Sequence, residues 1–242
     1  MLRRIIFSAF GAALIIGVAV SIIQSFTTVP LILQAEQYEG AMPQNHSAGN
    51  ASRGGWMAAY ADEAAGSAAT GESAWSPADG IERTAYTVIA NFVIGAAASL
   101  MLLGLMILKG DPIDARRGLL WGLAAFVAVS LLPSLGLPPQ LPGTPSADIA
   151  ARQGWWLFAV AFSAAGVALV AFGRQPWWWM GGIALIVVPH FVGTPVRPSS
   201  EVSYPGVMAG DFAVASLVVG AALWTLAGAA SAWLYQRLAA YG

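Results

Sequence analysis

The chain of 242 residues contains no cysteine and only two histidines, His46 and His190. The absence of cysteine excludes disulfides, thiolate metal sites and thiol catalysis. Charge is also scarce: Asp, Glu, Lys and Arg make up 10% of the residues, whereas soluble domains average about 25%. Because 57% of the residues are hydrophobic, the composition predicts an integral membrane protein rather than a soluble enzyme.

The sequence also lacks the motifs of common catalytic and nucleic-acid sites. It has no phosphate-binding glycine loop, no HExxH motif and no spacing typical of a catalytic triad. No basic run stands out from a net charge of −1, so no nucleic-acid partner is predicted. We therefore expect a protein that is not an enzyme and whose surroundings are the lipid bilayer.

Six apolar runs predict an all-α bundle of about six transmembrane helices in a single domain, 1–242. The first, second and last runs reach the roughly 20 residues that a spanning helix needs, while the third and fifth are short. Arg3 and Arg4 before the first run also fit a signal peptide, but the run exceeds the 7–15 residues of a signal core. The expected spans are 5–33, 84–108, 118–134, 155–172, 177–190 and 212–235.

The charge distribution predicts the topology of this bundle. Six spans with both termini in the cytoplasm place seven of the 11 basic residues inside, as the positive-inside rule requires. Ten of the 12 acidic residues then lie outside, where they would attract cations. The longest extracytoplasmic loop covers about 35–83. The seven inside residues are Arg3, Arg4, Lys109, Arg116, Arg117, Arg174 and Arg237.

Polar residues at the outer ends of the spans form a candidate metal site. His190 follows Pro189 at the end of the short fifth span and is interpreted either as a metal ligand or as a helix-end histidine bonded to a backbone carbonyl. Asn91 lies too deep in the second span to cap it, so we expect it to face the bundle interior. A polar stripe on the first span, Ser21, Gln24, Thr27 and Thr28, lies at a similar depth.

The remaining candidates are less specific. Glu82 and Asp211 lie where the second and last spans begin, and the helix dipole alone accounts for an acid at such a position. His46 lies in the outer loop and fits a solvated loop residue. The full predicted set of metal ligands is His190, Asp79, Glu82, Asn91, Asp211 and His46.

Four motifs in order resemble those of the CbtA family of predicted cobalt transporter subunits. They are WSPADGIERTAYT (75–87), GLLWGLAAF with LGLPPQLPG (118–143), RQGWW (152–156) and PHFVGTP (189–195). The resemblance implies a multi-pass protein of the bacterial inner membrane that serves cobalt supply for vitamin B12. It also implies a small partner, CbtB, with one span and a His-rich tail. The family is usually described with five spans, whereas the charge count favours six here.

Two departures from the family pattern leave two functions open. Family members commonly have a His-rich cluster in the first outer loop, where this chain has only His46, and Gln140 stands where a glutamate is expected. The first interpretation is a permease subunit for Co²⁺ or a similar divalent cation, which is then the transported substrate, with no other cofactor. The alternative is an accessory membrane subunit that associates with another membrane protein and transports nothing.

Overall fold

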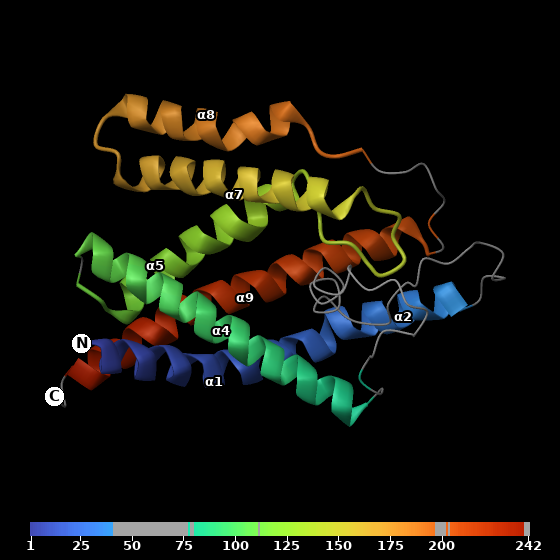
Figure 1. The fold of residues 1–242 in the computed structure, drawn as a ribbon, viewed down its shortest axis with the longest axis horizontal. Coiled ribbons are helices and arrows are strands. Elements are labelled where there is room, and N and C mark those ends of the chain that lie inside the picture. Colours follow the sequence, from blue (N-terminus) through green and yellow to red (C-terminus); the bar gives the residue numbers. More distant parts are fainter. Residues whose placement is uncertain (41–76, 78–79, 111, 197–201, 203, 240–242) are drawn as a thin grey trace.

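The computed structural model describes the chain except for residues 41–76, 78–79, 111, 197–201, 203 and 240–242 (Figure 1). Every regular element in the described part is helical, which confirms the predicted all-α class. The elements are α1 (Leu2–Phe26), α2 (Thr28–Gly40), α4 (Ile81–Lys109), α5 (Ala115–Phe126), the π-helical turn η1 (Val127–Leu131), α6 (Leu132–Ser134), α7 (Ile149–Phe172), α8 (Pro176–Val192) and α9 (Gly206–Ala239).

Five helices are long and apolar enough to cross a membrane. They are α1, α4, α7, α9 and the continuous stretch Ala115–Ser134, in which α5, η1 and α6 follow one another. The sixth, α8, is apolar but has only 17 residues. At 1.5 Å per residue it measures about 26 Å, slightly less than the roughly 30 Å of a hydrocarbon core.

Both chain termini lie at the same end of the molecule (Figure 1). Helix α8 starts at this end and runs beside α7 in the opposite direction. The seven basic residues predicted to be cytoplasmic sit at this end, which we call the basic end, because the helix ends that hold them meet there. This arrangement favours an even number of crossings. The count of six and the cytoplasmic position of the basic end stay predictions.

The first predicted span, 5–33, is not one helix. It breaks at Thr27, whose φ of −121° and ψ of −74° are not helical, and α2 then continues to Gly40. Pro30 accounts for much of the break, because it has no N–H to donate to the carbonyl of Phe26. The predicted outer loop therefore begins later than residue 35, and Glu36 lies on a helix.

Local sequence also shifts other boundaries. Pro133 cannot donate to the carbonyl of Val129, and the chain widens into η1 just before it, so that the third span remains helical over its full length. The helices α7 and α9 begin at Ile149 and Gly206, ahead of the predicted spans 155–172 and 212–235. The Asp148 carboxylate caps α7 by accepting from the Ala151 N–H at 3.0 Å.

The core of the bundle is built from α1, α4, α5 and α9, and small residues allow these helices to approach closely. Where α5 crosses α9, a Cβ on Gly228 would lie 2.0 Å from the carbonyl oxygen of Gly118, so neither position has room for a side chain. Many large apolar side chains point outward, as with Leu14, Val18 and Ile22 on α1, although others such as Ile16 and Leu102 are fully buried in the core. Small residues inside and large apolar residues outside are typical of a helical bundle that faces lipid.

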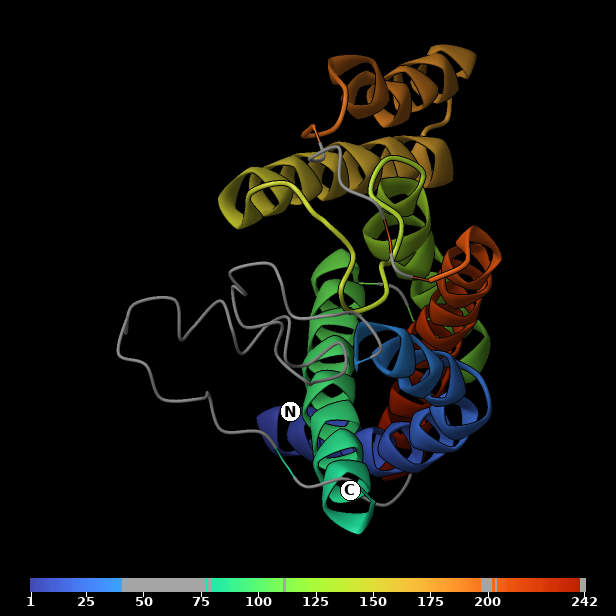
Figure 2. The same ribbon diagram turned by 90° about the vertical axis from the view of Figure 1, so that its right-hand side faces the viewer.

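The pair α7 and α8 forms a separate layer beside this bundle (Figure 2). The two helices pack on each other around Gly166 and Gly182, where a Cβ on Gly166 would lie 2.5 Å from the Gly182 carbonyl oxygen. The layer is attached to the rest mainly through η1 and α6, which α7 contacts. α8 is thus the most peripheral of the apolar helices.

Candidate functional site

The polar cluster with the deepest burial lies between α1 and α4. Asn91 is fully buried, and its amide nitrogen donates to Ser21 Oγ at 2.9 Å and to Gln24 Oε1 at 2.6 Å. Gly17 and Gly95 bring the two helices together here, because a Cβ on Gly95 would meet the Ile16 side chain at 2.9 Å. The prediction that Asn91 faces the bundle interior is confirmed.

The carbonyl oxygen of Asn91 is the unusual atom in this cluster. It is buried and accepts no hydrogen bond from the described residues, while both hydrogens of the amide are directed to α1. A buried acceptor without a donor costs about 1–3 kcal/mol, so such atoms often have a functional reason. An amide oxygen held in this way can accept a proton donor or coordinate a cation.

The break between α1 and α2 lies three residues beyond Gln24. The Thr27 N–H donates to the Gln24 carbonyl at 3.2 Å and not to the Ile23 carbonyl, which would be its acceptor in a regular α-helix. The Thr27 hydroxyl donates to the Ile23 carbonyl instead, at 2.7 Å. Ser21 likewise donates its hydroxyl to the Gly17 carbonyl, at 2.6 Å. Ser21 and Thr27 thus bond back to their own helix, while Gln24 bonds across to α4.

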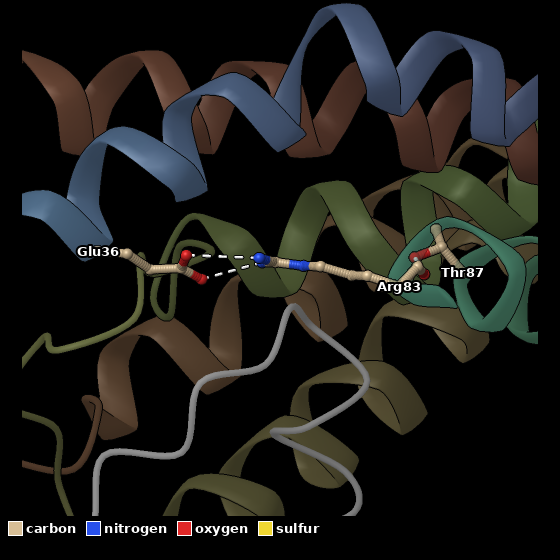
Figure 3. Close-up of polar contacts among 3 residues, drawn as sticks. All are labelled: Glu36, Arg83 and Thr87. Carbon is tan, nitrogen blue, oxygen red and sulfur yellow. Dashed lines mark hydrogen bonds and ion pairs between the residues drawn. The ribbon is translucent and has the colours of Figure 1, made fainter. Parts of the chain in front are cut away.

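An ion pair joins α2 to the start of α4 beyond the cluster (Figure 3). Both guanidinium ends of Arg83 reach the Glu36 carboxylate, with Nη2 to Oε1 at 2.9 Å and Nη1 to Oε2 at 3.4 Å. Each side chain is only about a fifth exposed, at 22% and 23%. The pair therefore holds α2 against α4 after the helical break.

His190 lies away from this cluster, in the last turn of α8. Its half-buried ring meets the ring of Trp155 on α7 edge-on, with 6.1 Å between the centroids. Gly136 makes room for Trp155, since a Cβ there would lie 2.3 Å from the indole. The indole N–H of Trp155 is itself buried and unpaired among the described residues.

Of the other predicted ligands, the two that the structure describes, Glu82 and Asp211, form no metal-binding group with His190. Glu82 is exposed in the first turn of α4. Asp211 is exposed on α9 and does not begin that helix, because α9 starts five residues earlier, at Gly206. Asp79 and His46 lie outside the described residues. In the described part of the chain, no three His, Cys, Asp or Glu side chains form a group that could hold a metal, so the predicted ligand set stays a prediction.

Two features of this region were not predicted from the sequence. The Glu36–Arg83 pair and the contact of Trp155 with His190 both join residues far apart in the chain. The contact of Asn91 with Ser21 and Gln24 could have been predicted from the sequence. Asn91 is a lone amide in an apolar run, and the polar stripe on the first run lies at a similar depth.

Long apolar helices around a buried polar cluster define a multi-pass helical membrane protein. The chain matches the model of the CbtA family, described as a probable cobalt transporter subunit, over residues 2–236. It therefore belongs to the CbtA family, and as a transporter subunit it has a partner. No curated protein and no solved structure matches the chain.

Proposed function

We propose that the chain is the permease subunit that moves Co²⁺, or a similar divalent transition-metal cation, inward across the bacterial inner membrane for vitamin B12-related cobalt supply. The observation that supports this most is the Asn91 carbonyl oxygen, buried in the bundle and without a donor among the described residues. Membership of a family of probable cobalt transporter subunits gives the class of substrate.

The available ligands suit passage rather than storage. Asn91 offers an amide oxygen, and the neighbouring Gln24 and Ser21 offer a second amide and a hydroxyl. Such neutral oxygens would replace part of the hydration shell without holding the ion tightly. The membrane potential can supply the driving force, because moving a divalent ion through 100 mV is worth about 4.6 kcal/mol.

Imidazole ligands would come from His190, from His46 and from the partner. We propose that His190, together with Asp79, Glu82, Asp211 and His46, which the charge distribution predicts to lie on the outer side, meets the ion before it reaches Asn91. A small single-span subunit of the CbtB kind, with a His-rich tail, would supply the ligands that this chain lacks. A transition metal prefers imidazole to carboxylate or amide ligands, so such a tail would provide the selectivity.

The accessory-subunit alternative is supported by a different observation. In the described part of the chain, no three His, Cys, Asp or Glu side chains come together, so this part offers little for a transition metal to bind. In that case the partner would form the pathway, and this chain would only position it.

Uptake of radiolabelled Co²⁺ into liposomes tests the proposal, with this chain alone and with the small partner. We expect uptake that is reduced at least tenfold in Asn91→Leu and reduced several-fold in His190→Ala. Ser163→Ala is the control, because Ser163 is also buried but lies on α7. Absence of uptake in both preparations would refute the permease function, whereas full uptake in Asn91→Leu would refute only the site.

A further inference from the structure

An apolar groove of about 390 Å³ lies between α5 and the α7–α8 layer, at the side of the basic end. All of its lining residues are aliphatic, among them Leu120 and Ala124 on α5, Val167 and Ala171 on α7, and Ile186 on α8. The groove exists because α7 packs on η1 and α6, while α5 and α7 diverge from there toward the basic end (Figure 1).

The dimensions of the groove suit a single acyl chain. Val127 marks its deep end. The rise from Arg116 to Val127 is about 16 Å, which is close to half of a hydrocarbon core of roughly 30 Å. The groove therefore covers the depth of one leaflet.

A cationic side chain stands on the same helical face as the groove. Arg116 lies four residues before Leu120 and eight before Ala124, so all three share one face of α5. Its neighbour Arg117 is already engaged, donating from Nη1 to the Pro112 carbonyl at 3.0 Å and lying 3.7 Å from the Asp114 carboxylate. Arg116 is exposed, at the depth where a lipid headgroup would lie.

Other residues place the headgroup region at this level. Trp177, Trp178 and Trp179 are all exposed at the start of α8, as is typical of residues at a membrane–water interface. Arg174 lies in the connection just before them, three residues after Ala171. Lys109 Nζ lies 4.7 Å from the Phe172 ring centroid, beside the same end of α7. Three basic residues, Arg116, Arg174 and Lys109, thus lie at or just beside the helix ends of the basic end.

We propose that this groove binds one anionic phospholipid, with an acyl chain between α5 and α7–α8 and its phosphate at Arg116. The lipid would fill the space between α5 and α7 and add to the contacts of Phe172 with Trp121 and Lys109 that already link the peripheral layer to the bundle. The proposal does not depend on transport of any metal.

Native mass spectrometry of the delipidated full chain in detergent tests the proposal, with dioleoyl-phosphatidylglycerol, dioleoyl-phosphatidylcholine and glycerol phosphate as separate probes. We expect the chain to retain phosphatidylglycerol at least fivefold more than phosphatidylcholine, and not to retain glycerol phosphate, which has no acyl chain. Arg116→Ala should lower retention of phosphatidylglycerol about fivefold, the effect of one basic residue near a charged headgroup. Arg3→Ala, which removes an equal charge at the same end on α1, should leave it unchanged.

The acyl part is tested separately. Ala171→Phe, at an exposed position, fills the groove and should abolish retention of both lipids, whereas Ala97→Phe on the outer face of α4 should not. Size-exclusion profiles and thermal melts establish that each variant is folded. Equal retention of the two lipids by the unmodified chain, equal effects of Arg116→Ala and Arg3→Ala, or undiminished retention in Ala171→Phe would each overturn the proposal.

Discussion

The hydrogen bond between Asn91 and Gln24 leads to a quantitative prediction about stability and transport together. Replacing Asn91 by Leu keeps a side chain branched at the γ position but removes both bonds to α1. A hydrogen bond between membrane helices contributes about 0.6 kcal/mol on average, so the two bonds are worth about 1.2 kcal/mol. Removing the Asn91 oxygen, which is buried without a donor, should raise the free energy of unfolding by about 1–3 kcal/mol.

The partner of Asn91 decides the net effect. Gln24 is 4% exposed, so its oxygen is left without a donor in Asn91→Leu and costs about 1–3 kcal/mol again. Ser21 is affected less, because its hydroxyl still donates to the Gly17 carbonyl. We therefore expect Asn91→Leu to be about 1 kcal/mol less stable than the unmodified chain. The double variant with Gln24→Met should regain that loss, because no buried amide then remains at this position.

The assay is equilibrium unfolding in mixed micelles of a mild detergent and SDS, applied to the two single variants and the double variant. The cycle should give a coupling free energy of about 0.6–1.7 kcal/mol between residues 24 and 91. Additive single effects would refute the hydrogen bond. Cobalt uptake should stay low in the double variant although its stability is restored. Normal uptake there would show that the amides only join the helices.

Two further predictions concern how the helices are joined. Arg83→Gln and Glu36→Gln should show a coupling free energy of about 1 kcal/mol in the same unfolding assay. The coupling should be lower in 0.5 M salt, because the pair is partly exposed and salt screens it. A coupling independent of salt would contradict an ionic origin. Gly228→Ala should lower the unfolding free energy by about 1–3 kcal/mol, because its Cβ would meet the Gly118 carbonyl. Gly104→Ala on α4 has open space and should instead gain up to about 1 kcal/mol, so equal effects of the two substitutions would disprove the close crossing.

The helical segments themselves could be predicted well, because an apolar run indicates membrane burial whichever helices it packs against. The inward orientation of Asn91 was predicted for the same reason: an amide facing lipid would be too costly. The break at Thr27 was not predicted, since Thr27–Pro30 lie inside an apolar run and Pro is tolerated in membrane helices. The start of α9 was predicted too late, because Gly206, Gly210 and Asp211 fit a loop as well as a helix.

The sequence by itself determined that this is an all-α membrane protein with its basic residues concentrated at one end, and its motifs indicated the CbtA family. Composition and hydropathy suffice for this, because the bilayer acts on each segment separately. Only the tertiary structure decided which polar groups meet: Asn91 with Gln24, Arg83 with Glu36, His190 with Trp155. It also decided that α7 and α8 diverge from α5 and leave an aliphatic groove. These features depend on how separate helices cross, and that is set by close contacts between small residues such as Gly118 and Gly228.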